Sequence, residues 1–201
     1  MRRLILLRHG VTEWNQDRRF QGHEDVPLAP RGRQQAAAAA AHLAALRPSL
    51  LWASDLSRAR ETAGYVAAET GLVPVLDDRL REIDVGDYQG LTHDEARERF
   101  GPGPWDYADH GGESNADLAA RVCAPVEEAA AALADGATGI LAFHGHAIRM
   151  ATIGFLGWPL EVVSTLGALD NCAWVELTDV PAGSSKSAWR LVAYNAVTPI
   201  S

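Results

Sequence analysis

Residues Leu4-Ile5-Leu6-Leu7-Arg8-His9-Gly10 decide the fold class of this 201-residue chain. Four consecutive apolar side chains leave no polar face, which is typical of a strand buried on both sides in a parallel sheet. Similar runs, rich in branched or aromatic residues, recur at 50–53, 139–143, 172–177 and 189–194. We therefore predict a mainly parallel sheet built from these strands.

Helical segments alternate with the predicted strands. The residue pattern favours helices over 31–46, 55–70, 114–133 and 147–156. Such alternation predicts an α/β fold, which we take to be a three-layer α/β/α sandwich with a mainly parallel central sheet. The length suits a single domain over residues 1–201. The segment 100–112, rich in glycine and proline, is expected to be a loop insertion.

Composition excludes several classes of protein. Hydrophobic residues make up 47% of the chain, which rules out disorder as the main state. The net charge of −8 argues against a nucleic-acid partner, since phosphate-backbone affinity needs a basic field. No apolar run is long enough for a membrane span or a secretory signal. Cys123 and Cys172 lack a CxxC spacing, so we expect reduced thiols and a cytoplasmic location.

Charged and polar residues follow three of the predicted strands. Ligands of open α/β sheets bind at the carboxyl ends of the strands, so these residues are candidates for a common site. They are Arg8 and His9 after the first strand, Ser54, Asp55 and Arg58 after the second, and His144, Gly145 and His146 after the strand at 139–143. The segment Leu80-Arg81-Glu82-Ile83-Asp84 adds a carboxylate.

This set of residues suits phosphoryl transfer. Two guanidinium groups and one histidine can hold the oxygens of a phosphoryl group, and a second, neutral histidine can attack the phosphorus. A carboxyl group can protonate the leaving oxygen and later take a proton from water. The arginines supply the positive charge, so we expect neither a metal nor a cofactor.

Five motifs, in this order, resemble those of the histidine phosphatase superfamily, the phosphoglycerate-mutase-like proteins. They are Leu6-Leu7-Arg8-His9-Gly10-Val11-Thr12-Glu13-Trp14-Asn15 with the loop 21–28, Ser54-Asp55-Leu56-Ser57-Arg58-Ala59, Leu80-Arg81-Glu82-Ile83-Asp84-Val85-Gly86, Gly112-Glu113-Ser114, and Phe143-His144-Gly145. The strings at 79–93, 110–114 and 189–196 resemble the glucosyl-3-phosphoglycerate phosphatase branch of that superfamily.

The resemblance implies a role for each matching residue. His9 would be the phosphate-accepting nucleophile and Glu82 the proton donor, with Asp84, Asp87 and Glu113 as rivals for the acid. The phosphoryl oxygens would be held by Arg8, Arg58 and His144, helped by Asn15 and the backbone of Gly145. The substrate mouth would be lined by Gln21, Gly22 and His23. The resemblance also implies that the chain can form a homodimer, although the residues leave the oligomeric state open.

Two positions depart from the family pattern, and both flank the expected phosphate pocket. Val11 stands where the family often has Glu or Gln, and His146 stands where it often has a second glycine. These departures bear on the choice of substrate more than on the chemistry. For His23 and His146 themselves, a loop histidine with its hydrogen bonds satisfied is the favoured interpretation.

The predicted function is a metal-independent phosphatase of a small phosphorylated metabolite, a sugar phosphate or phosphoglycerate type, acting through a phosphohistidine. A phosphoglycerate mutase and a broad-specificity acid phosphatase are the alternatives. The spacing His144-x-His146 also suggests a metal hydrolase, although no third ligand has an obvious spacing. An inactive binding module is the fourth possibility, and the complete set of His, Arg and Glu residues argues against it.

Overall fold

The central sheet has six strands in the order β3-β2-β4-β1-β5-β6. The computed structural model describes residues 1–180 and 189–198. Its strands are β1 (Arg3–Arg8), β2 (Leu50–Ala53), β3 (Val75–Leu76), β4 (Thr138–Phe143), β5 (Trp174–Asp179) and β6 (Trp189–Ala196). The first four run parallel, whereas β5 pairs antiparallel with both β1 and β6. The predicted α/β fold with a mainly parallel sheet is confirmed.

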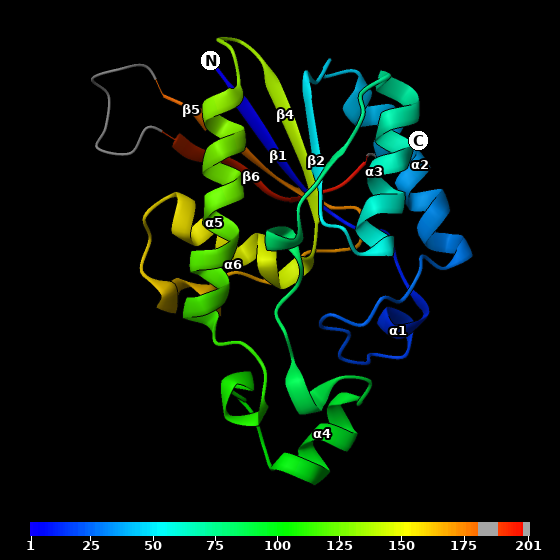
Figure 1. Cartoon of the computed structure of the whole chain (residues 1–201), viewed down its shortest axis with the longest axis vertical. Coiled ribbons are helices and arrows are strands. Elements are labelled where there is room, and N and C mark those ends of the chain that lie inside the picture. The colour runs from blue at the N-terminus through cyan, green and yellow to red at the C-terminus, as the bar shows by residue number, and fades with distance from the viewer. Residues whose placement is uncertain (181–188, 199–201) are drawn as a thin grey trace.

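Each face of the sheet is covered by a pair of helices. Successive residues of a strand point to opposite faces, so alternate residues of β1 pack against different helix pairs. Leu4 and Leu6 of β1 pack with residues of α5 (Asn115–Ala132) and α6 (Gly145–Phe155). Ile5 and Leu7 pack with residues of α2 (Pro30–Ala44) and α3 (Ser57–Thr70). Figure 1 shows the two helix pairs on opposite sides of the sheet. The three-layer α/β/α sandwich is therefore confirmed.

Helix α2 lies very close to the loop that follows β1, because small residues face that loop. A Cβ atom on Gly32 would stand 2.1 Å from the carbonyl oxygen of Val11. A Cβ atom on Gly10 would stand 2.4 Å from the carbonyl oxygen of Gly32. Ala36, Ala39 and Ala40 of the same helix are buried. Gly32 thus allows a close helix contact that holds the loop after β1.

The structure differs from the sequence prediction in several places. Strand β5 begins at Trp174 rather than at residue 172, because Cys172 lies in a turn with φ of 59°. Strand β3 escaped prediction because both of its residues are exposed and it forms no apolar run. Helix α4 (His93–Phe100) was also missed, since Ala96 is its only buried residue. The segment 100–112 is not wholly loop, because it holds a 3-10 turn at Tyr107–His110.

A cap lobe, residues 86–112, extends beyond the carboxyl ends of the parallel strands. It contains α4, which Figure 1 places well away from the sheet, near the short helix α1 (Glu13–Gln16). Its centre is the fully buried Tyr88, whose ring contacts those of Phe100, Trp105, Tyr107 and His110. This aromatic cluster lets a small, highly charged segment fold over the end of the sheet.

Backbone hydrogen bonds bring the chain segments after three parallel strands together. The amide of His9 donates to the carbonyl of Phe143 at 3.0 Å, and that of Ser54 donates to Ala142 at 3.0 Å. The predicted site residues after β1, β2 and β4 thus share one edge of the sheet, and this edge faces the cap lobe. Among the helices of the described residues, none combines the length and apolar character needed to cross a membrane.

Candidate active site

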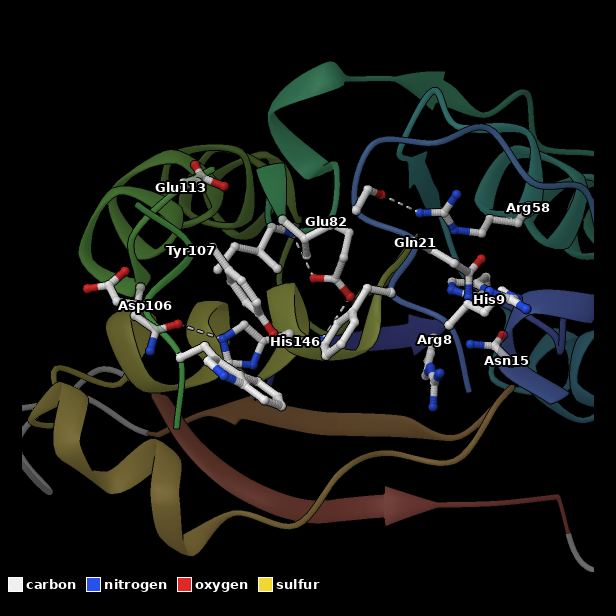
Figure 2. A pocket seen from close by; sticks show the side chains of 17 residues that line it. Arg8, His9, Asn15, Gln21, Arg58, Glu82, Asp106, Tyr107, Glu113 and His146 are labelled. Carbon is white, nitrogen blue, oxygen red and sulfur yellow. Dashed lines mark hydrogen bonds between the residues drawn. The ribbon is translucent and has the colours of Figure 1, made fainter. Parts of the chain in front are cut away.

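A pocket of about 410 Å³ lies between the carboxyl ends of the strands and the cap lobe. Its lining mixes charged, polar and aromatic side chains, and Figure 2 shows many of them pointing toward a common space. The lining residues are Arg8, His9, Asn15, Arg19, Phe20, Gln21, Gly22, Arg58, Glu82, Ile83, Val85, Trp105, Asp106, Tyr107, Glu113, Asn115 and His146.

His9 has a single tautomer in which one ring nitrogen is free. Its side chain is buried, and its Nδ1 lies 2.7 Å from the carbonyl oxygen of Gly10. A carbonyl can only accept, so Nδ1 carries the proton and Nε2 keeps its lone pair. Burial first, and then the charges of Arg58 and Arg8, hold the pKa of His9 well below its ordinary value. The imidazole is therefore neutral and nucleophilic at physiological pH.

Arg8 presents a buried donor that lacks a protein partner. Its Nε is buried without a hydrogen bond, while its Nη1 donates to the carbonyl of Leu169. Gly145 lies directly behind this side chain, where a Cβ atom would stand 3.1 Å from the Arg8 Nε. Burial lowers the pKa of Arg8 from its ordinary value. Arg8 nevertheless lines the pocket, where its positive charge suits an anionic ligand.

Arg58, on α3, is 1% exposed and donates three hydrogen bonds. Its Nη1 and Nη2 bind the carbonyls of Glu24 (2.6 Å) and Gly22 (2.8 Å), so it also shapes the loop at the pocket mouth. Its Nε donates to His144 Nδ1 at 3.3 Å. Burial lowers the pKa of Arg58 to about 10, which leaves the group charged at neutral pH.

His144 stands behind the nucleophile rather than in the pocket wall. Because Arg58 can only donate, His144 Nδ1 accepts and its Nε2 carries the proton, which goes to Ser54 Oγ at 2.9 Å. The rings of His9 and His144 meet edge to face, with centroids 5.2 Å apart. Burial lowers the pKa of His144 well below its ordinary value, with further lowering by Arg58. His144 therefore supports both His9 and Arg58 from the interior.

The carboxylate of Glu82 lies at the amino end of α6. Its Oε1 accepts from the amides of Ile83 (3.0 Å) and Ala147 (2.9 Å), and its Oε2 accepts from the amide of His146 at 3.1 Å. A helix amino terminus favours a negative charge, so these bonds place the carboxylate firmly. Figure 2 shows Glu82 between the His9 side and the Tyr107 side of the pocket.

Two side chains hold the backbone of Glu82 in place. His23 Nε2 donates to the Glu82 carbonyl at 2.8 Å, which agrees with its interpretation as a satisfied loop histidine. Arg121 of α5 donates to the same carbonyl at 3.0 Å and to those of Arg79 and Arg81 at 2.9 and 3.0 Å. The predicted acid thus belongs to a rigid, hydrogen-bonded loop.

Asn15 and Gln21 enter the pocket beside Arg8 and His9. The amide oxygen of Asn15 accepts from the Thr12 amide at 3.1 Å and from Asn171 Nδ2 at 3.2 Å, so its NH2 group stays available for a ligand. Gln21 is buried, and its Oε1 accepts from the Thr12 hydroxyl at 3.0 Å, which leaves its NH2 group available as well.

The sequence from residue 4 to residue 196 matches the histidine phosphatase superfamily (branch 1). The chain belongs to this superfamily. It is a phosphatase, a phosphoric monoester hydrolase, with the predicted His, Arg and Glu residues gathered at one site.

Among similar proteins, glucosyl-3-phosphoglycerate phosphatase of Mycolicibacterium vanbaalenii is 39% identical to this histidine phosphatase, over 98% of this chain and 95% of its own length. A probable phosphoglycerate mutase of an Enterobacter species is 36% identical over 86% and 83% of the two chains. The structure of a mycobacterial glucosyl-3-phosphoglycerate phosphatase complexed with VO3 matches with a TM-score of 0.87 and 36% identity, covering 98% of this chain and all of that one. The suspected branch of the superfamily is thereby confirmed.

Most of the residues that the sequence proposed for the site of this histidine phosphatase line the pocket. They are Arg8, His9, Asn15, Gln21, Gly22, Arg58 and Glu82. His23, His144 and Gly145 lie behind that wall, where they contact Glu82, Arg58 and Arg8. Of the rival acids, Glu113 also lines the pocket, but its two oxygens pair with Arg121 at 2.8 and 2.6 Å.

The metal hydrolase suggested by the His144-x-His146 spacing finds no support in the geometry. Their Nε2 atoms bond to different partners, Ser54 and Asn115. Residues 1–180 and 189–198 contain no group of three or more His, Cys, Asp or Glu side chains placed to hold a metal ion.

Sequence reasoning missed several residues that shape the site of this histidine phosphatase. Arg121 lies in the middle of an amphipathic helix and Asn171 in an irregular segment, and neither belongs to a motif. The hydrogen bond from Arg121 to Glu82 joins residues 39 positions apart in the sequence, and the one from Asn171 to His9 joins residues 162 positions apart. No local pattern signals such pairs. By contrast, Trp105 and Tyr107 lie in the segment that the sequence predicted as a loop, where the residues from Trp105 to Glu113 are expected around the mouth of the pocket, and both line the pocket.

Proposed function

We propose that the protein hydrolyses a small phosphate ester of the phosphoglycerate or sugar phosphate type through a phosphohistidine on His9. One observation carries the proposal: a neutral His9, with Nδ1 bound to Gly10 and Nε2 free, lies in the wall of the pocket together with the buried Arg58 and the half-buried Arg8. A phosphoryl group seated there meets positive charge on its oxygens and a nucleophile at its phosphorus.

The reaction proceeds in two displacements at phosphorus. The lone pair of His9 Nε2 attacks phosphorus, the P–O bond to the ester oxygen breaks, and that oxygen takes a proton from the Glu82 carboxyl group. In the second step, the Glu82 carboxylate takes a proton from water, the water oxygen attacks phosphorus, and the P–N bond breaks. Inorganic phosphate leaves, and His9 and Glu82 regain their initial states.

The choice of substrate rests on the pocket and on the relatives. A volume of about 410 Å³ suits a small metabolite, and arginine and amide donors at one end suit a phosphate. The similar enzyme of M. vanbaalenii is named a glucosyl-3-phosphoglycerate phosphatase. This supports an ester of glycerate, with or without a sugar, as the substrate, and water as the acceptor.

A phosphate-release assay over a panel of esters tests this function. The panel contains glucosyl-3-phosphoglycerate, 3-phosphoglycerate, a hexose phosphate and a phosphotyrosine peptide, each with and without EDTA. We expect kcat/KM for the glycerate or sugar esters to exceed that for the peptide by roughly a hundredfold, about 2.8 kcal/mol of transition-state binding, and EDTA to have no effect. Similar kcat/KM values throughout would indicate a broad-specificity phosphatase. Interconversion of phosphoglycerates without net phosphate release would indicate a mutase.

A further inference from the structure

The pocket has a second end, away from the arginines, whose side chains the proposed chemistry does not use. In Figure 2, Asp106, Tyr107 and His146 lie on one side of Glu82, and Arg8, His9 and Arg58 lie on the other. Asn115 lines the pocket too, and it is bonded to His146. We call Asp106, Tyr107, Asn115 and His146 the distal end of the pocket.

A chain of hydrogen bonds in the distal end has only one possible direction. Arg149 Nη1 lies 3.4 Å from His146 Nδ1, and a guanidinium can only donate, so Nδ1 is the accepting nitrogen. In a neutral imidazole the other nitrogen then carries the proton. His146 Nε2 lies 2.6 Å from Asn115 Oδ1, which accepts that proton. Burial lowers the pKa of His146, which favours the neutral ring.

The direction of this chain fixes the orientation of the Asn115 amide. Asn115 is an exposed residue at the start of α5, where core packing does not decide which way its amide points. With Oδ1 bound to His146, the NH2 group is the part of Asn115 that remains free for a ligand in the pocket. The side chain is therefore a pre-oriented hydrogen-bond donor.

Asp106 adds an acceptor to the same end. Its Oδ1 accepts from the Ala108 amide at 3.1 Å, which leaves Oδ2 available, and the structure pairs it with no cation among the described residues. A carboxylate on the ligand would be repelled there. A hydroxyl group both accepts from an amide and donates to a carboxylate, so it satisfies both residues.

We propose that Asn115 is a specificity-determining residue that binds a hydroxyl group of the substrate beyond its phosphate, with His146 and Arg149 as the positioning residues that orient its amide. The inference rests on the proposed phosphatase function and extends it to the class of the alcohol portion. That portion is an uncharged polyhydroxyl group, such as a sugar or polyol, where it reaches the distal end.

The test compares two esters that differ in their hydroxyl groups. Hexitol 6-phosphate and n-hexyl phosphate have the same number of carbons, but the latter offers nothing to Asn115 or Asp106. We expect the wild type to prefer the hexitol ester. In Asn115→Leu, the ratio of the two kcat/KM values should fall about fivefold, the effect expected of one lost uncharged hydrogen bond. Circular dichroism checks that the variant folds.

Asn115→Asp separates recognition from a structural role. The aspartate still accepts from His146 and offers the ligand an oxygen, to which a hydroxyl can donate, so it should keep more of the ratio than Asn115→Leu does. A wild-type ratio in Asn115→Leu would mean that Asn115 binds no hydroxyl group of the substrate, and would overturn the inference.

A second pair of variants tests the positioning role of His146. His146→Gln keeps an N–H donor at the reach of Nε2 and should preserve most of the ratio, whereas His146→Leu should lose it. Equal ratios in these two variants would contradict the orientation of Asn115 by His146.

The outcome for the wild type distinguishes this inference from the proposed function. If it hydrolyses both esters with equal kcat/KM, the distal end does not bind hydroxyl groups and only the inference is wrong. If it releases phosphate neither from these esters nor from the panel of glycerate and sugar esters, the proposed function itself is wrong.

Discussion

His9 donates from Nδ1 to the carbonyl of Gly10 across 2.7 Å, and this one bond decides which nitrogen faces a substrate. The acceptor is held in turn by α2, since the backbone of Gly32 comes so near that a Cβ atom on Gly10 would stand 2.4 Å from its carbonyl oxygen. The amide of Gly10 also donates to Thr62 Oγ1 at 3.1 Å. These contacts fix the backbone of Gly10, and the Gly10 carbonyl in turn holds the ring of His9 in one orientation.

Replacing His9 should abolish turnover. In His9→Ala, the covalent route has no substitute nucleophile, so we expect kcat to fall by roughly a thousandfold or more. Labelled substrate should leave an acid-labile, base-stable adduct on the wild type and none on the variant. His42→Ala is the matched control, because His42 is exposed on α2 and does not line the pocket. Normal turnover in His9→Ala would disprove the phosphohistidine.

Arg58 should not be replaceable by lysine. A lysine keeps the charge but has one nitrogen, whereas Arg58 binds Gly22, Glu24 and His144 through three. We expect Arg58→Lys to lose roughly 10- to 100-fold in kcat/KM and Arg58→Ala to lose more. Steady-state kinetics with one phosphate ester measure kcat/KM for both variants. Equal values for Arg58→Lys and the wild type would contradict the need for the three guanidinium nitrogens.

Glu82→Gln should discriminate between leaving groups. An alkyl ester needs its oxygen protonated, whereas p-nitrophenolate leaves without help, so the loss should be about 100-fold or more for the alkyl ester and far smaller for p-nitrophenyl phosphate. Glu113→Gln is the matched control, because Glu113 lines the same pocket but its carboxylate is paired with Arg121. If Glu113→Gln shows the leaving-group effect and Glu82→Gln does not, Glu113 is the acid.

Arg121 should act on catalysis through Glu82 and also stabilise the fold. Arg121→Met removes the donors to three carbonyls and leaves the mostly buried Glu113 without its cation. We expect a loss of about 2–3 kcal/mol in the free energy of unfolding, measured by urea denaturation. Activity toward the alkyl ester should fall more than activity toward p-nitrophenyl phosphate. An equal loss on both would show that Arg121 does not position the acid.

Stability should decline in mildly acidic solution. His9 and His144 have pKa values well below 6.5 in the folded protein, so they stay neutral while the unfolded chain takes up protons. Below pH 6.5 the free energy of unfolding should therefore fall, by up to about 1.4 kcal/mol per pH unit for each histidine. Urea titrations between pH 7 and 5 measure the slope, and His144→Gln should make it shallower. Identical slopes would contradict a neutral, buried His144.

Local patterns were enough to predict the fold class and seven of the residues that line the pocket. The apolar run before Arg8 indicated a buried parallel strand, and the residues after β1, β2 and β4 belong to short motifs with fixed spacing. Such signals are carried by neighbouring residues, so they survive in the sequence alone. The elements that escaped prediction, β3 and α4, bury almost no side chains and hence leave almost no pattern. The homodimer and the cytoplasmic location stay predictions.

The tertiary structure decided the protonation and the direction of each functional group. Which nitrogen of His9 is free depends on a carbonyl held by α2, and the paired state of Glu113 depends on Arg121 in another element. The orientation of Asn115 depends on His146, which is 31 positions away in the sequence. An imidazole or amide side chain can present either a donor or an acceptor, so the direction of its hydrogen bonds depends on the atoms that folding brings to it. The sequence by itself therefore pointed to seven of the residues that line the pocket, and only their packing determined what each one can donate, accept or attack.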